Sequence, residues 1–278
     1  MAAPGRAKGP EKVVHTEPSI YRKITVYESE GERCIRFGRE RAPRQTCISL
    51  KDPGHLVFNY TKMMLAALYL HPEPRRILII GLGGGTLATT LSAIFPEAEI
   101  DTVEIDPAVV RVAQRYFGFR VSDRVRVAEE DGRAFVRRAA REGESFDIVM
   151  LDAFEQEYIP EHLLTREFLT EVKSVLTPEG VLAANTWSSS RLYDRESETY
   201  ESVFGRFFSL RKVNRVILAR KDGVPSKEMI RENAYALDKR LGSFGVWSQQ
   251  LLPLFSMNRD WRHGAPILTD RGTASRPS

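Results

Sequence analysis

Residues 77–85 read Ile-Leu-Ile-Ile-Gly-Leu-Gly-Gly-Gly, and this stretch decides the fold class. The four apolar residues, most of them β-branched, predict a buried strand. The glycines directly after it allow a sharp turn and let a ligand approach the main chain closely. A helix reaching Phe95 is expected next. Strand, glycine loop and helix in this order are typical of a doubly wound α/β fold, although the loop alone is also compatible with a purely structural turn.

The same alternation of strands and helices continues downstream. Further strands are predicted at 100–105, 124–128, 146–151, 181–186 and 216–219. Helices are expected between them, the first opened by Pro107, and two amphipathic helices are expected within 227–255. Strands that alternate with helices indicate a mostly parallel sheet covered on both faces.

The residues before this alternation have a different character. Short β-rich runs at 20–27, 33–37 and 45–50 predict hairpins, and helical spacing follows over 56–70. We therefore expect the following division: a disordered tail at 1–18, a β-hairpin domain at 19–54, a Rossmann-like domain at 55–270 and a disordered tail at 271–278.

Composition excludes several functional classes. Lys and Arg (41) nearly balance Asp and Glu (37), and no four basic residues are consecutive, so no nucleic-acid groove is expected. No apolar run is long enough to cross a membrane, and the N-terminus lacks an apolar signal segment. Cys34 and Cys47 are too few for a disulfide framework, so we expect reduced thiols rather than a bridge, and no zinc motif is present. A cytoplasmic protein is expected.

Glu104 ends the second predicted strand, where a carboxylate can accept hydrogen bonds from both hydroxyls of a ribose. This spacing fits dinucleotides and S-adenosyl compounds. Thr86 stands where a dinucleotide fingerprint would have its third glycine. Asp131-Gly132 ends the third strand, where the carboxylate can accept from an adenine amino group, although Asp131 is also a good helix N-cap. Together these features favour an adenosyl ligand.

Asp152 follows the fourth predicted strand, and Glu155 lies three residues further on. Ligands of open parallel sheets bind at the carboxyl ends of the strands. Two carboxylates there can hold and deprotonate a cationic amine, although a surface turn is the alternative.

These motifs in this order resemble spermidine synthase and its relatives. The resemblance is carried by Ile77–Gly85, Val103–Pro107, Asp131-Gly132, Asp147–Asp152 and Ile267–Asp270. It implies a methyltransferase-like Rossmann fold with a mostly parallel seven-stranded sheet, a small N-terminal β-hairpin domain, and a homodimer or homotetramer. It further implies transfer of an aminopropyl group from decarboxylated S-adenosylmethionine to an amine such as putrescine, with no metal.

The resemblance also implies roles for individual residues. Asp152 would be the base that takes a proton from the amine, Tyr60 would orient that amine, and Glu155 would be the second acid. The residues expected to bind the co-substrate are Gln45, Gly81, Gly83, Gly85, Thr86, Glu104, Asp131 and Gly132.

Three motifs depart from the family pattern. Thr86-Leu87 replaces Asp-Gly in the glycine loop, Tyr60-Thr61-Lys62 replaces Tyr-His-Glu, and residues 152–155 replace Asp-Ser-Ser-Asp with Asp-Ala-Phe-Glu. A neutral Thr86 would tolerate the carboxylate of intact S-adenosylmethionine. A methyltransferase that uses this donor is therefore the alternative, followed by a non-catalytic relative and, last, by a nicotinamide oxidoreductase.

Overall fold

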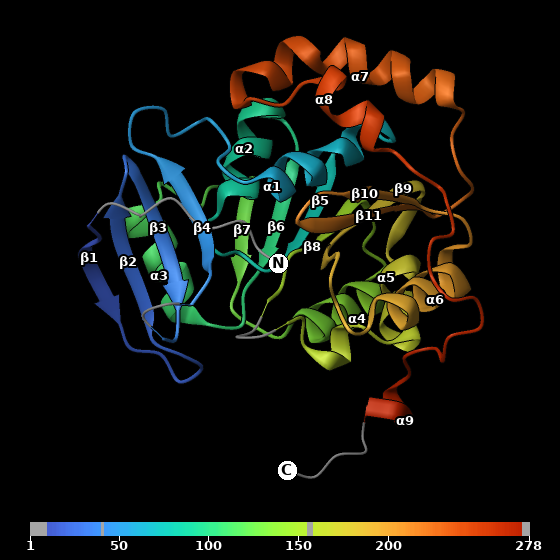
Figure 1. Cartoon of the computed structure of the whole chain (residues 1–278), viewed down its shortest axis with the longest axis horizontal. Helices are drawn as coiled ribbons and strands as arrows, with labels where there is room; N and C mark the ends of the chain where they lie inside the picture. Colours follow the sequence, from blue (N-terminus) through green and yellow to red (C-terminus); the bar gives the residue numbers. More distant parts are fainter. Residues whose placement is uncertain (1–9, 40–41, 155–157, 274–278) are drawn as a thin grey trace.

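A computed structural model describes residues 10–39, 42–154 and 158–273 as two sheets packed side by side (Figure 1). The smaller sheet is antiparallel, with its strands in chain order. Its strands are β1 (Lys12–Glu17), β2 (Ile24–Ser29), β3 (Glu32–Phe37) and β4 (Arg44–Ser49). The expectation of a disordered tail over 1–18 is wrong for Lys12–Glu17, because β1 pairs along β2. Residues 1–9 lie outside the described part.

The larger sheet has seven strands in the order β10-β11-β9-β8-β5-β6-β7. Neighbouring strands from β9 to β7 are parallel, whereas β11 and β10 are antiparallel. The strands are β5 (Arg76–Ile80), β6 (Glu99–Val103), β7 (Val125–Ala128), β8 (Phe146–Leu151), β9 (Leu176–Trp187), β10 (Phe208–Arg211) and β11 (Asn214–Arg220). The predicted methyltransferase-like fold class is confirmed.

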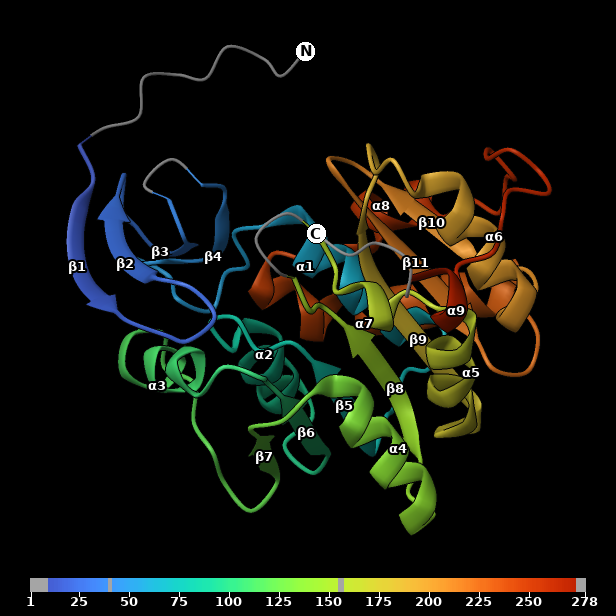
Figure 2. The same cartoon turned by 90° about the horizontal axis from the view of Figure 1, so that it is seen from below.

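Helices cover both faces of the larger sheet (Figures 1 and 2). One face packs against α1 (Asn59–Met64), the 3-10 helix η1 (Leu65–Tyr69), α2 (Thr86–Ile94), α7 (Lys227–Leu241) and α8 (Ser248–Leu251). The other face packs against α4 (Gly132–Glu142), α5 (Arg166–Ser174) and α6 (Tyr193–Phe204). Between the two sheets lies α3 (Pro107–Tyr116), whose Val109 and Val112 contact the apolar side of the smaller sheet. This packing brings the smaller sheet to the ligand-binding edge of the larger one.

The remaining elements are short. They are the 3-10 helices η2 (Glu161–Leu163), η3 (Gly242–Phe244) and η4 (Leu252–Leu254), and the helix α9 (Asp270–Thr273). The expected disordered tail at 271–278 is wrong for 271–273, because these residues belong to α9. Residues 274–278 lie outside the described part. None of the helices in the described ranges has the length and apolar character needed to cross a bilayer.

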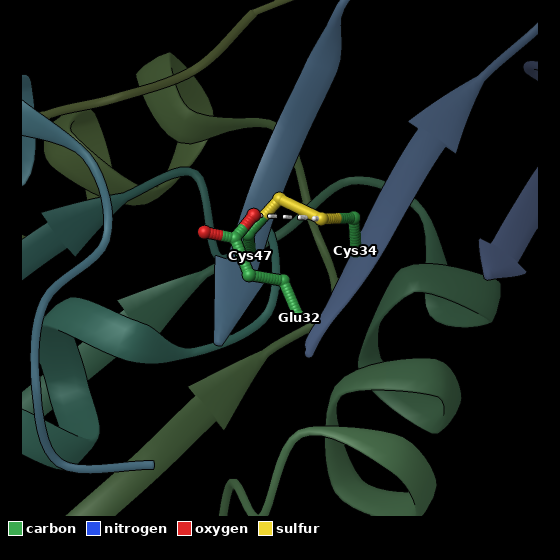
Figure 3. Close-up of side chains that lie close together, drawn as sticks. All are labelled: Glu32, Cys34 and Cys47. Carbon is green, nitrogen blue, oxygen red and sulfur yellow. Dashed lines mark hydrogen bonds between the residues drawn. A yellow bond between two sulfur atoms is a disulfide. The ribbon is translucent and has the colours of Figure 1, made fainter. Parts of the chain in front are cut away.

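Cys34 and Cys47 form a disulfide, which corrects the expectation of reduced thiols (Figure 3). The two residues face each other directly in the β3–β4 register, with their Cα atoms 4.1 Å apart. Such cross-strand proximity satisfies the geometric condition for a bridge, and it depends on a register that spacing alone does not reveal. Glu32 lies beside the bridge, and the bridged sulfurs are not thiolates that could bind a metal.

Candidate active site

A cavity lined by described residues opens at the carboxyl ends of β5, β6, β7 and β8. Its volume is about 700 Å³, within the range of small-molecule sites. Of the predicted site residues, Gln45, Tyr60, Gly81, Gly83, Glu104, Asp131, Gly132 and Asp152 line it. Gly85 and Thr86 do not line it, and Glu155 lies outside the described residues. The structure therefore brings most of the predicted residues together around one space.

The glycine loop approaches the catalytic candidate at its first residue. Gly81 has a φ of +97°, and a Cβ there would lie 2.5 Å from the carbonyl oxygen of Asp152. Only glycine permits both this backbone conformation and this contact. Gly85, at a φ of +74°, makes the turn into α2 instead, and Thr86 is the first residue of that helix. The loop thus lines the cavity at its start and turns away from it at its end.

Glu104 is held at the end of β6 by two backbone amides. Its Oε2 accepts from the amide of Leu82 at 3.1 Å, and its Oε1 accepts from the amide of Asp106 at 3.0 Å. Burial raises the pKa of Glu104, and the two amides oppose this rise because they favour the charged form. A carboxylate offers about four lone pairs, so two of them remain for the hydroxyls of a ribose.

Asp131 both caps a helix and lines the cavity, so its role as an N-cap does not exclude a role in ligand binding. Its Oδ1 accepts from the amide of Ala134 at 2.9 Å at the start of α4, and its Oδ2 lies 2.7 Å from Nε2 of His162. Burial alone would raise the pKa of Asp131, but these two contacts together lower it. Asp131 is therefore ionised at neutral pH.

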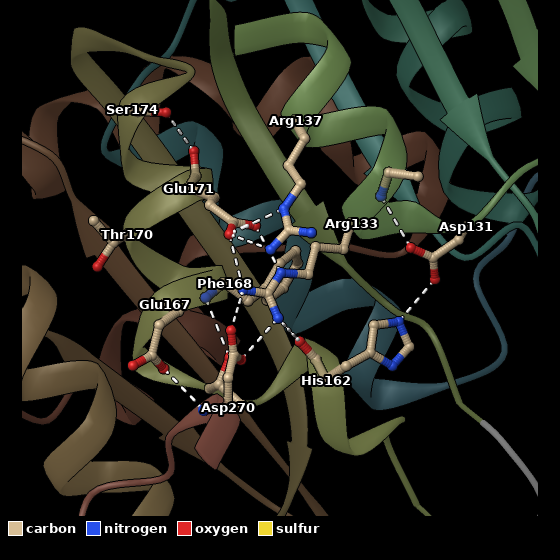
Figure 4. Close-up of polar contacts among 12 residues, drawn as sticks. Asp131, Arg133, Arg137, His162, Glu167, Phe168, Thr170, Glu171, Ser174 and Asp270 are labelled. Atoms are coloured by element: carbon tan, nitrogen blue, oxygen red, sulfur yellow. Dashed lines mark hydrogen bonds and ion pairs between the residues drawn. The ribbon is translucent and has the colours of Figure 1, made fainter. Parts of the chain in front are cut away.

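An arginine on α4 fixes this corner of the cavity (Figure 4). The guanidinium of Arg133, which is 6% exposed, lies between the carboxylates of Glu171 and Asp270 and also donates to the carbonyl of His162. This arrangement joins α4, α5, η2 and the first residue of α9. It holds His162 in place beside Asp131. The sequence did not indicate His162, because a single histidine outside any motif gives no recognisable signal.

Asp152 has a different environment at the end of β8. Its Oδ1 accepts from Nδ2 of Asn185 at 2.8 Å, and its carboxylate also accepts from the hydroxyl of Tyr60. Burial raises its pKa to about 7, although both donors act in the opposite direction. Burial also raises the pKa of Tyr60 well above 10, so this hydroxyl stays a donor. Asp152 can therefore exchange a proton near neutral pH, as a general base must.

The smaller sheet supplies part of the wall. The Tyr60 hydroxyl lies 3.4 Å from the backbone carbonyl of Gln45 on β4, and the hydroxyl of Thr46 accepts from the amide of Gly84 at 3.2 Å. These contacts tie β4 to both the glycine loop and α1. The cavity is therefore shared between the two sheets.

A segment before β2 completes the enclosure, and sequence reasoning did not identify it. Ile20, Tyr21 and Arg22 line the cavity. The Arg22 guanidinium lies over the ring of Phe37, at 4.2 Å from the ring centroid, and donates to the carbonyl of Phe154 at 3.0 Å. Arg22 thus links the smaller sheet to the chain that follows Asp152. A single basic residue in a β-rich segment gives no signal of this role.

Comparison with known proteins gives one family match and several similar structures. The spermine/spermidine synthase domain matches residues 57–215. The polyamine aminopropyltransferase of Vibrio vulnificus is 43% identical over 270 residues, which cover 95% of this chain and 90% of the relative. A spermidine synthase solved with the transition-state analogue AdoDATO has a TM-score of 0.66 at 22% identity, over 86% of this chain and 88% of that chain.

A methyltransferase is also similar to this chain. The human methyltransferase-like protein 13, solved in complex with SAH, has a TM-score of 0.62 and is 31% identical. It covers 66% of this chain, and the match spans 93% of the solved chain. The chain is therefore similar in sequence and fold both to aminopropyltransferases and to a protein solved with bound SAH.

Proposed function

The chain belongs to the spermine/spermidine synthase family and is a transferase, and we propose that it moves an aminopropyl group from decarboxylated S-adenosylmethionine to an amine such as putrescine. One observation carries this proposal: Asp152, a buried carboxylate with a pKa of about 7, lines the same cavity as Glu104 and Asp131. The family match supplies the reaction class.

The nucleoside of the co-substrate would occupy the half of the cavity formed by β5, β6 and β7. Glu104 would accept from the ribose hydroxyls with the lone pairs that the backbone amides leave. Asp131 would accept from the adenine amino group, while Gly132, Gly81 and Gly83 allow close approach of the ligand to the main chain. Gln45 would close this half from the side of the smaller sheet.

The acceptor amine would lie beside Asp152 and Tyr60. An ammonium has no lone pair, so it must first lose a proton, and Asp152 is the group that accepts it. The amine nitrogen then forms a bond to the aminopropyl carbon as the carbon–sulfur bond breaks. The bonding electrons go to sulfur, and methylthioadenosine leaves as a neutral thioether. The sulfonium is itself a good leaving group, so this chemistry needs no metal.

Methyl transfer from intact S-adenosylmethionine is a second candidate. It is favoured by the likeness to the human methyltransferase and by the sequence of the glycine loop. The loop carries no carboxylate between Gly81 and Thr90, so nothing in it repels the carboxylate of the intact donor. The two reactions would use the same nucleoside site and differ at the opposite end of the donor.

One comparison of donors tests the proposal. The protein is incubated with putrescine and either decarboxylated or intact S-adenosylmethionine, and the products are identified by mass spectrometry. We expect spermidine and methylthioadenosine from the decarboxylated donor. Methylated product and S-adenosylhomocysteine from the intact donor, with no spermidine, would replace the proposal by the second candidate. Titration calorimetry with both donors and methylthioadenosine measures binding separately from turnover.

We also propose that the protein is a cytoplasmic homodimer or homotetramer assembled through the smaller sheet. Support comes from β1, an edge strand whose Val13 and Val14 are 56% and 36% exposed. Exposed strand edges readily pair with another chain. Light scattering coupled to gel filtration gives the mass in solution. A parent mass equal to a monomer, or one unchanged by Val13→Lys, would contradict this assembly.

A further inference from the structure

Asn185 is a buried polar residue at the carboxyl end of β9, next to the proposed base. It is 2% exposed, and it ends an apolar strand segment whose preceding residues Val181 to Ala184 belong to the cores on the two faces. In the parallel β8–β9 register Leu151 pairs with Ala184, so Asp152 and Asn185 follow at the same level. A buried amide needs partners for both its ends.

Both ends of the Asn185 amide are engaged. Its Nδ2 donates to Oδ1 of Asp152 at 2.8 Å, and its Oδ1 accepts from Nδ2 of Asn214 at 3.0 Å. Asn214 begins β11, two pairs away from the Val216–Asn185 pair in the antiparallel β9–β11 register. Because Asn214 donates to the carbonyl oxygen, the amide of Asn185 must present its NH₂ group to the carboxylate.

We propose that Asn185 is a positioning residue for the transfer, fixing the plane of the Asp152 carboxylate, and that Asn214 sets the direction of its amide. This inference rests on the proposed function, in which Asp152 accepts the proton of the amine. Asn185 also favours the charged carboxylate, because a donor to one oxygen stabilises the ionised form.

Burial is the main influence on the pKa of Asp152, and the contact with Asn185 opposes it. Among the described residues, the side chains that affect its proton affinity are Asn185 and Tyr60. Tyr60 comes from α1, which packs against β9 and β11. Tyr200 of α6 lines a small cavity together with Asn185, and burial raises the pKa of Tyr200, which keeps it neutral. Without Asn185, Tyr60 would be the one remaining donor among the described residues that opposes the effect of burial on the pKa of Asp152.

The first test removes the donor and follows the pH dependence. In Asn185→Ala, we expect the acid limb of kcat for the aminopropyl assay to move upward by about one pH unit, since a donor to the charged form is lost. The plateau value should fall by about tenfold, and the Kd of methylthioadenosine should stay within about twofold of the parent, because the nucleoside half is untouched. Asn185→Gln, which keeps an amide, should recover part of the loss.

The second test concerns the relay from Asn214. Asn214→Ala should shift the acid limb in the same direction by a smaller amount. It should add nothing in the Asn185→Ala background, because the two residues act as one chain. Asn233→Ala is the matched control: it removes another asparagine hydrogen bond, to the carbonyl of Tyr69, far from the cavity. It should leave the pH profile unchanged.

A direct titration separates this inference from the function on which it rests. Carbon-detected NMR of ¹³C-labelled aspartate, with Asp152→Asn to assign the signal, reports the pKa of Asp152 without turnover. A higher pKa in Asn185→Ala supports the inference. An unchanged pKa and an unchanged acid limb would overturn it, even if Asp152→Asn is inactive. Full activity of Asp152→Asn would instead overturn the role of the base.

Discussion

The two halves of the cavity hold their acids in different ways. In the half proposed for the nucleoside, Glu104 accepts from two backbone amides after β5 and β6, and Asp131 accepts from one at the start of α4. In the amine half, Asp152 accepts from the side chains of Asn185 and Tyr60. Backbone donors fix an acid in place and favour its charged form, which suits binding, although burial still raises the pKa of Glu104. Two neutral side-chain donors leave a buried acid with a pKa near 7, which suits proton transfer.

The largest effect is expected where this contrast is broken at Asp152. Asp152→Asn keeps the shape of the side chain but cannot accept the proton, so kcat should fall by about 10²–10⁴-fold. Steady-state kinetics with the aminopropyl donor measures the fall, and calorimetry should show nearly unchanged binding of methylthioadenosine. If Asp152→Asn lowers both kcat and the affinity for methylthioadenosine, Asp152 also contributes to nucleoside binding, which would contradict the division of the cavity into two halves.

A change in the nucleoside half should have the opposite profile. Glu104→Gln should weaken binding of methylthioadenosine by about 1–3 kcal/mol, the usual cost of losing a hydrogen bond to a charged group. Calorimetric Kd values measure this loss. Glu104→Asp serves as a control that keeps the charge but shortens the reach. An affinity for methylthioadenosine equal to that of the parent in Glu104→Gln would show that Glu104 does not bind the ribose.

The contrast also predicts how stability depends on pH. The pKa of Asp152 is about 7 in the folded state, above its unfolded value, so the folded state binds the proton more tightly. The contribution of protonated Asp152 to the free energy of unfolding is complete below the pKa of the unfolded state, and it is lost as the pH rises through 7. Asp152→Asn should therefore be more stable than the parent at pH 8, and this advantage should shrink by about 2–3 kcal/mol at pH 5. Urea unfolding at both pH values measures the difference.

The smallest effect is expected at Asp131. In Asp131→Asn, the side-chain oxygen can still cap α4 and accept from an adenine amino group, whereas the negative charge beside His162 is lost. Partly exposed pairs contribute about 0–1 kcal/mol, so the Kd of methylthioadenosine should rise less than about fivefold. Asp131→Ala loses the cap as well and should lose more affinity. Equal losses in both variants would show that the charge alone matters.

The fold was predictable where local patterns report directly on structure. The glycine loop, the apolar strands and the acids that follow them placed Glu104, Asp131 and Asp152 correctly at one edge of the sheet. Helix α6 was missed because its charged and polar residues obscure the apolar spacing, and β1 was missed because most of its residues are polar. The second half of the helix expected at 56–70 is the 3-10 helix η1 instead, a distinction that apolar spacing does not make.

The site was less predictable where it depends on pairing between distant segments. The disulfide follows from strand register, and the contact of Arg22 with Phe154 joins residues that are 132 positions apart. Asn185 carries no local signal, because one amide at the end of an apolar strand is chemically unremarkable until its neighbours are known. Three-dimensional pairing, rather than residue type, gives these residues their roles.

The cavity shared between the two sheets makes the co-substrate a structural link as well as a reactant. A molecule that contacts Gln45 on one side and Glu104 on the other binds only when both sheets are folded and packed together. At a free concentration 100 times its Kd, such a ligand adds about 2.7 kcal/mol to the stability of that packed state. The supply of donor would thus govern not only the rate of the reaction but also the lifetime of the folded protein.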